Sequence, residues 1–175
     1  MNEEEAIALL VSSGCSSGVI EHCRAVAHQS RKIADGISEC ARKKGAEIDL
    51  DSDAIFLGGM LHDIGRSRSH DIDHAVEGAK IARENNLNDK LVNIIERHIG
   101  AGISRDEAAE LGLPARDYIP LTIEEKIIAH ADNLVFGSRV RTLDELVLDL
   151  RKKKIDEKII QRVIELNNEI NAMLC

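Results

Sequence analysis

The sequence predicts one all-α domain that spans all 175 residues. Three observations favour this class. Apolar residues recur at helical spacing along nearly the whole chain, no alternating polar and apolar pattern persists, and there are only two prolines. A chain of this length can bury a core without disulfides or structural metals. The composition, 43% hydrophobic and 31% charged, is ordinary for a globular protein.

The individual helices follow from the apolar periodicity and from signals at their ends. We expect helices over residues 3–12, 18–43, 52–64, 73–86, 89–99, 105–111, 123–136, 143–153 and 156–173. Three of them begin with capping-box patterns, in which a side chain satisfies the free amides of the first turn: Ser104-x-x-Glu107, Thr122-x-x-Glu125 and Thr142-x-x-Glu145. Glycines lie in the short loops that connect the predicted helices, and the chain has no internal repeat.

The helix over 18–43 carries two histidines in different settings. An advance of about 100° per residue places His28 among charged residues, so we expect an exposed side chain. His22 lies at the edge of the apolar arc, one turn before Val26. At this position a half-buried structural histidine and a metal ligand remain equally open.

The helix over 52–64 is apolar on every side, which predicts a central, buried element. It nevertheless carries His62 and Asp63 next to each other. An unpaired buried carboxylate costs several kcal/mol, so such groups are normally paired or bound to metal. Asp63 could simply hold His62 by a hydrogen bond, but adjacent helix positions point about 100° apart, which disfavours that interpretation.

The later helices place three more polar residues on apolar faces. His74 begins its helix at the edge of a face that includes Gly78, where the missing side chain would admit another backbone or a ligand. His98 ends the following helix in line with apolar residues, and Asp132 lies on a mostly apolar helix. His130 points to nearly the opposite side from Asp132, so we expect a packed or surface histidine there.

Six inward-facing residues therefore have the chemistry of metal ligands: His22, His62, Asp63, His74, His98 and Asp132. Four imidazoles and two carboxylates suit a transition metal better than magnesium or calcium, which prefer oxygen ligands. Six ligands exceed the need of one tetrahedral ion, so we expect one or two divalent ions (Mn, Fe, Ni, Co or Zn). Asp63 is the natural bridge between two ions. Walker A, GxGxxG, HExxH and GxSxG motifs are absent.

At these residues the chain resembles the HD superfamily of metal-dependent phosphohydrolases. The run His62-Asp63-Ile64-Gly65 reads as the HDIG form of the signature, His22 resembles the first ligand, and Asp132 in Ala-Asp-Asn-Leu resembles the distal aspartate. His74 and His98 are similar to the extra histidines of binuclear members. The resemblance spans residues 18–136, which implies a helical bundle with the metal site in its core and a C-terminal extension over 142–175. Small archaeal-type HDIG proteins look similar.

The resemblance implies hydrolysis of a phosphate ester or anhydride by a water that the metal activates. The substrate is expected to be a small nucleotide or related metabolite. Asp63 is the expected catalytic residue together with Arg66, which would contact phosphate through its guanidinium. Ser67, Arg68, Arg139 and Arg141 are weaker substrate-binding candidates, and His70 is expected to be a loop residue. The chain lacks the GYP extension of cyclic dinucleotide hydrolases, so the substrate stays open.

Three alternatives remain for the function. The chain could bind metal and nucleotide without turnover, as a regulatory module. It could be a di-iron oxygenase, as a few HD relatives are. A purely structural helical protein is disfavoured, because it would bury several polar side chains unpaired.

Composition limits the partners and the compartment. The formal net charge is −8 and only three residues are aromatic, which argues against nucleic-acid polymers as partners. No apolar run is long enough to span a membrane, and the acidic start is unlike a signal peptide, so a cytoplasmic protein is expected. The four cysteines form no CxxC pair and are expected to be free thiols or small buried residues. Apolar stripes on the last two helices are expected to be core contacts or the interface of a homodimer.

Overall fold

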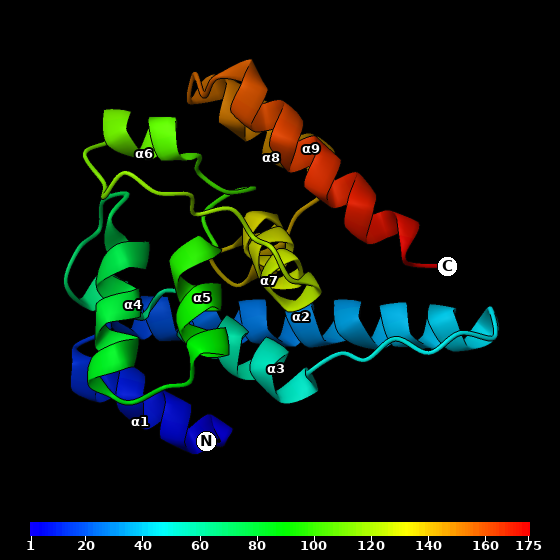
Figure 1. Ribbon diagram of the computed structural model, residues 1–175, viewed down its shortest axis with the longest axis horizontal. Coiled ribbons are helices and arrows are strands. Elements are labelled where there is room, and N and C mark those ends of the chain that lie inside the picture. The colour runs from blue at the N-terminus through cyan, green and yellow to red at the C-terminus, as the bar shows by residue number, and fades with distance from the viewer.

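The computed structural model describes residues 1–175, and their arrangement confirms the all-α prediction (Figure 1). In chain order the elements are α1 (Glu3–Ser13), α2 (Ser17–Lys43), α3 (Ser52–Leu61), the 3-10 turn η1 (Ile64–Ser67), α4 (His74–Glu84), α5 (Asp89–Arg97), α6 (Arg105–Glu110), α7 (Ile123–Leu134), β1 (Val135–Phe136), β2 (Arg139–Val140), α8 (Leu143–Lys152) and α9 (Glu157–Ala172). No helix combines the length and apolar character that a membrane crossing requires.

The helix starts agree closely with the capping signals. The boxes at Ser104 and Thr142 form as expected, with the glutamate side chain returning to the cap amide. Thr122 also caps its helix, but Glu125 does not close the box. Its carboxylate instead accepts from the Leu121 amide and pairs with Arg97. A third complete box, at Asn2, was not among the predicted ones.

Most helices end one to three residues earlier than expected, and two of these ends shape the candidate site. The predicted helix over 52–64 ends at Leu61, and the chain passes through a turn into η1. The predicted helix over 123–136 ends at Leu134, because Val135 and Phe136 pair antiparallel with the residues of β2. The turn of this hairpin contains Gly137, whose φ of 62° lies in the left-handed region that favours glycine.

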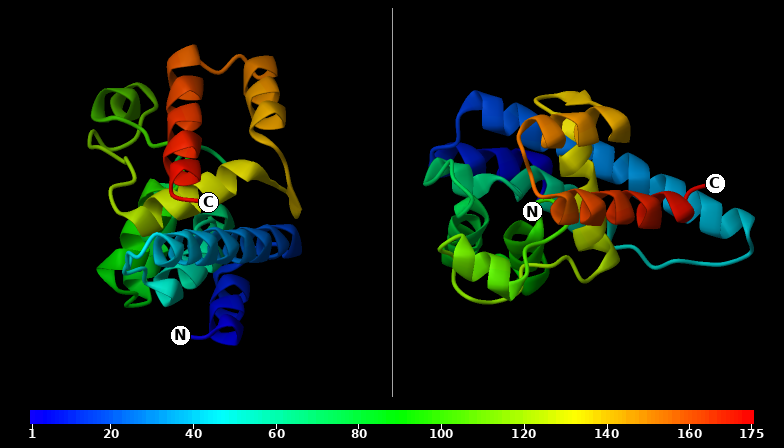
Figure 2. Two further views of the ribbon diagram at one scale, coloured as in Figure 1. Left: turned by 90° about the vertical axis from the view of Figure 1, so that its right-hand side faces the viewer. Right: turned by 90° about the horizontal axis from the view of Figure 1, so that it is seen from above.

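The helices pack around two apolar cores. The first lies between α1, the start of α2, α3, α4 and α5, and the second lies between the rest of α2, α3, α7 and α9. Helix α3 is buried from Ala54 to its end at Leu61, as its sequence predicted. The last two helices stand on the side of α7 that is opposite to α1 (Figure 2, left). The elements that carry histidine or aspartate candidates therefore meet between the cores.

Glycines permit the closest approaches between these elements. A Cβ on Gly59 would lie 2.6 Å from the Ala27 Cα, so the absent side chain lets α3 lie directly against α2. A Cβ on Gly65 would lie 1.8 Å from the His74 carbonyl oxygen and 2.4 Å from the Gly78 nitrogen. The sequence predicted that another backbone or a ligand approaches Gly78 closely. In the structure the backbone of Gly65 occupies that position. The glycine of the HDIG run thus brings the start of α4 against η1.

The prediction that all four cysteines are free was wrong for two of them. Cys40, near the end of α2, forms a disulfide with Cys175, and their Cα atoms are 5.3 Å apart. The pairing joins residues 135 positions apart in sequence, so no local spacing could indicate it. Cys15 and Cys23 are free, and Cys23 is buried as expected for a small apolar residue.

Candidate metal centre

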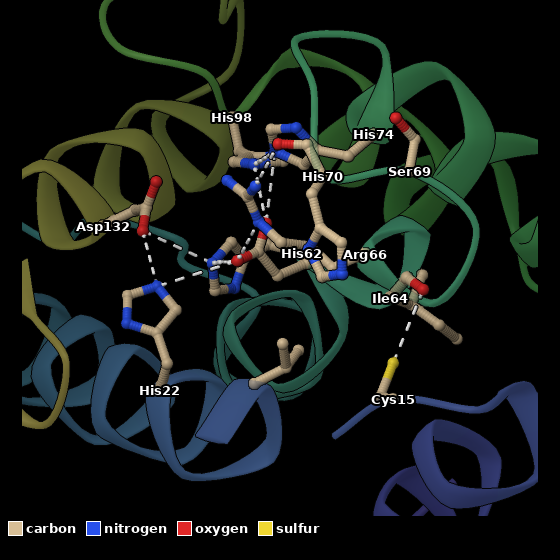
Figure 3. Close-up of polar contacts among 12 residues, drawn as sticks. Cys15, His22, His62, Ile64, Arg66, Ser69, His70, His74, His98 and Asp132 are labelled. Atoms are coloured by element: carbon tan, nitrogen blue, oxygen red, sulfur yellow. Dashed lines mark hydrogen bonds and ion pairs between the residues drawn. The ribbon is translucent and has the colours of Figure 1, made fainter. Parts of the chain in front are cut away.

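Six side chains from five segments converge in one cluster. Figure 3 labels His22, His62, His74, His98 and Asp132 among them. His22 comes from α2, and Asp132 comes from the last turn of α7. His62 is the C-cap of α3 and Asp63 follows it, while His74 and His98 lie at the start of α4 and the end of α5. These are the six residues that the sequence singled out as ligands: His22, His62, Asp63, His74, His98 and Asp132.

All four imidazoles are oriented in the same way, by a backbone carbonyl behind the ring. The Nδ1 atoms of His62, His74 and His98 lie 2.8, 2.7 and 2.8 Å from the carbonyl oxygens of Gly59, Asp71 and Ile95. The Nδ1 atom of His22 lies 3.0 Å from the Gly137 carbonyl oxygen in the β1–β2 turn. A carbonyl only accepts, so each Nδ1 carries the proton. Each Nε2 is therefore directed into the cluster, which is how metal-binding histidines are held.

The side chains form two groups. In the first group, the Asp132 Oδ1 atom lies 2.9 Å from the His22 Nε2 atom and 3.4 Å from the His62 Nε2 atom. The Asp63 Oδ2 atom faces the same two nitrogens, at 4.0 and 3.8 Å. We call His22, His62, Asp132 and the Oδ2 atom of Asp63 the first ligand set. These spacings match ligand atoms arranged around one ion.

The second group lies on the other side of the Asp63 carboxylate. Its Oδ1 atom lies 3.2 Å from the His74 Nε2 atom and 3.6 Å from the His98 Nε2 atom. The two Nε2 atoms are 3.2 Å apart. We call His74, His98 and the Oδ1 atom of Asp63 the second ligand set. Each ring carries its proton on Nδ1, so the two facing Nε2 atoms both present a lone pair. At this distance the lone pairs repel each other unless a proton or a cation lies between them.

Unpaired polar atoms test whether the residues fit a metal. The His62 Nε2 atom and the Asp63 Oδ1 atom are fully buried, and neither has a hydrogen-bond partner. Leaving such atoms unsatisfied costs about 1–3 kcal/mol each, more where a charge is involved. One atom comes from each ligand set, and both face the interior of the cluster. Histidine nitrogen and carboxylate oxygen suit first-row transition metals, so the donor set fits such ions.

The electrostatics of the cluster favour added positive charge. Burial alone would raise the pKa of Asp63 and of Asp132, but the surrounding imidazoles, His62 first, outweigh it and hold both pKa values below the usual range. Burial lowers the pKa of His62, yet the two carboxylates outweigh that effect and raise it well above its ordinary value. Burial also lowers the pKa of His98. Both carboxylates therefore stay ionised among the imidazoles.

The predicted substrate-binding arginines have different positions. Arg66 is half-buried beside the cluster, where its Nε donates to the Asp63 Oδ2 atom at 3.0 Å and its Nη1 donates to the His70 carbonyl at 3.1 Å. Arg68 pairs with Glu84 and Glu77 instead. Arg139 is exposed on β2 and pairs with Glu145. Of the three, only Arg66 is brought into contact with a ligand candidate.

The other predicted histidines lie outside the cluster. His28 is exposed on α2, as expected. His130 is buried and packed, and burial lowers its pKa to about 4. His70 is an exposed loop residue that contributes only its carbonyl, to Arg66.

Sequence reasoning did not assign Asn133 and Arg141 their role at the end of α7, and it considered Arg141 only as a weak phosphate contact. The Asn133 side chain donates to the Gly100 carbonyl at 2.8 Å, which ties α7 to the loop after α5. Arg141, which follows the hairpin, donates twice to the Asn133 carbonyl. Asn133 stands beside Asp132 in sequence, but Arg141 is nine residues away from that ligand, and only the hairpin brings it back.

Comparison with known families gives one match over most of the chain. The model of the HD domain family matches residues 19–137. The chain is 47% identical over 175 residues to the uncharacterized protein MJ0778 of Methanocaldococcus jannaschii, and covers 99% of both chains. It is 38% identical to a tRNA (cytidine(56)-2'-O)-methyltransferase of Picrophilus torridus over 98% of this chain. The chain spans only 47% of that methyltransferase, about half its length.

A solved structure shares the fold. It is the HD domain of the phosphodiesterase PgpH from L. monocytogenes, in complex with cyclic-di-AMP. The TM-score is 0.54 at 20% identity, and the match covers 97% of this chain and 96% of the other.

Proposed function

The chain belongs to the HD domain family, and from this premise we propose that it is a metal-dependent phosphohydrolase that cleaves a small phosphate ester or anhydride. The donor atoms that would hold one or two divalent transition ions are those of the two ligand sets. A divalent ion there would lower the pKa of water and neutralise the charge that develops on phosphorus.

One observation carries the proposal, namely the division of the Asp63 carboxylate between two groups of imidazoles. Its Oδ2 atom faces His22 and His62, and its Oδ1 atom faces His74 and His98, at 3.2 Å from the nearer one. A carboxylate whose two oxygens serve different ligand groups is suited to bridge two ions. A structural histidine would need a partner for its inner nitrogen, and the His62 Nε2 atom has none.

The chain's own residues would position the substrate at the edge of this cluster. The Nε and Nη1 atoms of Arg66 donate hydrogen bonds to Asp63 and to the His70 carbonyl. Its second terminal nitrogen makes no hydrogen bond within the protein, and the side chain is 31% exposed. A guanidinium in this position can donate to a phosphate oxygen while it stays bonded to Asp63. Arg68 and Arg139 could assist only after leaving their glutamate partners.

The proposed substrate is a small phosphorylated nucleotide or a related metabolite. PgpH, which shares the fold, binds cyclic-di-AMP, a molecule of this class. The chain itself offers few aromatic side chains for stacking on a base, since Phe56, Phe136 and Tyr118 are its only ones. Recognition through phosphate and ribose, rather than through the base, is therefore the expected mode.

The test combines metal analysis with a substrate screen. The purified protein is analysed for bound transition metals, stripped, and reloaded singly with Mn²⁺, Fe²⁺, Co²⁺, Ni²⁺ or Zn²⁺. Each form is incubated with phosphomonoesters, cyclic phosphodiesters including cyclic-di-AMP, mononucleotides and dinucleoside polyphosphates. We expect product with at least one ion and one class. His62→Ala should abolish it, while His28→Ala, an exposed histidine of α2, should retain it.

Other outcomes would identify the two alternative functions. Metal and nucleotide binding without any product across the screen would contradict hydrolysis and favour a regulatory module. An iron-loaded protein that forms product only with oxygen would favour a di-iron oxygenase. Hydrolysis with Mn²⁺ under anaerobic conditions would exclude the oxygenase.

A further inference from the structure

Arg141 links the C-terminal helices to the metal centre through the backbone, without touching a ligand side chain. Its side chain is only 13% exposed, although it follows an exposed hairpin. The Nε and Nη2 atoms donate to the Asn133 carbonyl at 3.2 and 3.1 Å, and the backbone nitrogen donates to the Leu134 carbonyl at 2.8 Å. One residue thus satisfies the final two carbonyls of α7, which have no partner within the helix. Its positive charge is also favourable at a helix C-terminus.

These hydrogen bonds act on the segment that carries Asp132, one of the four members of the first ligand set. Asp132 immediately precedes Asn133, so the end of α7 sets the position of its carboxylate. The hairpin between Leu134 and Arg141 contains Gly137, whose carbonyl orients His22 through Nδ1. When Arg141 closes the hairpin onto α7, it fixes the Asp132 backbone and the acceptor of His22 together.

The second ligand set has no such connection. The rings of His74 and His98 are oriented by the carbonyls of Asp71 and Ile95, which lie on or beside their own helices. Asn133 bonds to Gly100 near His98, but through its own side chain and not through Arg141. A change at Arg141 should therefore reach the first set and leave the second set unaffected.

Helix α8 holds Arg141 in place. The Nη1 atom donates to the Asp149 Oδ2 atom at 3.1 Å. The same carboxylate oxygen also pairs, at 2.9 Å, with the exposed Lys153, the residue that follows the end of α8. Asp149 therefore pairs with two basic side chains, Arg141, which also contacts α7, and Lys153, which does not.

We propose that Arg141 is a positioning residue for the first ligand set, oriented by Asp149, and that α8 thereby sets the affinity of this set for its divalent ion. The inference rests on the proposed function, because it takes the first set to be a metal site. Arg141 is not a substrate contact in this scheme.

Co²⁺ titration of the metal-free protein, followed by visible absorption, tests the proposal in two backgrounds. His98→Ala leaves only the first set complete, and His22→Ala leaves only the second. We expect Arg141→Lys to weaken Co²⁺ binding about 10-fold in the His98→Ala background, within the range found when outer partners of metal ligands are replaced. In the His22→Ala background the affinity should change less than about twofold. Equal losses in the two backgrounds, or no loss in either, would overturn the proposal.

Asp149→Asn and Lys153→Gln form the matched pair on α8. Asp149→Asn should weaken binding to the first set by a smaller factor than Arg141→Lys does, while Lys153→Gln should leave it unchanged. An equal effect of the two would mean that α8 acts through general stability, which contradicts the proposal. If Arg141→Lys does not fold, the Co²⁺ affinities of Asp149→Asn in the His98→Ala and His22→Ala backgrounds are compared instead.

A second readout needs no metal. In ¹⁵N spectra of the metal-free protein, the His22 ring should show Nδ1 protonation in the wild type and a mixture of tautomers in Arg141→Lys, with His74 unchanged. An unchanged His22 ring would overturn the inference even if affinity fell. If the wild type binds no Co²⁺, the proposed function fails, and this inference falls with it.

Discussion

The candidate metal centre and the C-terminal helices are built on opposite principles. The centre places two carboxylates among four imidazoles in the interior, and backbone carbonyls orient every ring. Helix α9 buries Leu166 and Ile170 in the core that contains α7, and it is attached at the surface by ion pairs, including Arg162 with Glu107 and Lys126 with Glu169. The disulfide of Cys175 adds a covalent attachment.

The contrast indicates that the candidate metal ligands and many of the contacts that stabilise the fold lie in different parts of the chain. Burying polar groups at the centre costs free energy unless a cation or a proton compensates. The surface pairs of the extension contribute little each, about 0–1 kcal/mol, but they cost little as well. We therefore expect changes at the centre to remove metal binding. Changes in the extension should alter stability gradually, apart from the contact of Asp149 with Arg141, which reaches the first ligand set.

The largest effect should follow Asp63→Ala, which removes the bridge between the ligand sets. Both ions should be lost, together with all metal-dependent hydrolysis and all stabilisation of the fold by added metal. His98→Ala should lose mainly the ion of the second set. Metal-to-protein ratios and thermal unfolding with and without a chelator measure both effects. Full metal occupancy in His98→Ala would refute the two-ion arrangement.

Gly65→Ala should be the most destabilising change that alters no ligand. The new Cβ would meet the His74 carbonyl oxygen at 1.8 Å and the Gly78 backbone, neither of which can move without shifting α4. We expect a loss of about 3 kcal/mol in unfolding free energy, the upper part of the range for overpacking. Urea unfolding provides the measurement. Gly18→Ala is the control, since nothing closer than 4.0 Å surrounds its Cβ position, and a loss as large there would contradict the steric explanation.

The disulfide should have the next largest effect on the stability of the fold. Cys175→Ser should lower the unfolding free energy by about 2–3 kcal/mol, because the crosslink closes a long loop of the unfolded chain. Wild-type protein in reductant should match the variant in urea unfolding. Cys15→Ser, which changes a free cysteine, should keep the full response to reductant. Loss of metal binding in Cys175→Ser would break the proposed separation between extension and centre.

The smallest effect should be the pH dependence of the Arg162–Glu107 pair. Arg162 and, to a smaller degree, the Ser104 cap lower the pKa of Glu107 to about 2, from a usual value of 4.5. Because the folded pKa is depressed, this stabilisation is complete above pH 4.5 and is lost as the pH falls toward 2. Arg162→Gln should therefore cost about 1 kcal/mol near neutrality, allowing for solvent screening of the pair.

Unfolding curves of wild type and Arg162→Gln between pH 7 and pH 2 check this dependence. The two should converge at the acidic end. The control is Arg151→Gln, which breaks an exposed pair with Glu157. A constant difference across the range would show that Arg162 acts through packing instead.

Local signals in the sequence predicted most of the fold. Helix starts depend on neighbouring residues, so Ser104 and Thr142 could be recognised as caps. The inward direction of His22 and Asp132 followed from angles around each helix, because 3.6-residue periodicity is a local property. What the sequence could not supply were contacts between distant segments.

The early end of α3 shows the limit. The apolar pattern of its sequence predicted a helix as far as Ile64, but the tight contact of Gly65 with α4 requires the chain to leave the helix before that point. Likewise, the helical periodicity through Phe136 concealed a hairpin that is stabilised by pairing with Arg139 and by the return of Arg141 to Asn133. Each difference arises from a partner that lies far away or across a turn.

The Cys40–Cys175 crosslink has a mechanical consequence. If the chain is pulled at its two ends, the force passes from Met1 along the first 40 residues and through the sulfur bridge to Cys175. Everything between those cysteines, including five of the six candidate ligands, carries no load. Only His22 stands on the loaded path, which is at most about 140 Å long when extended. Tension would therefore unravel α1 and α2 and withdraw one imidazole from the centre, while a crosslinked ring keeps the other five ligands.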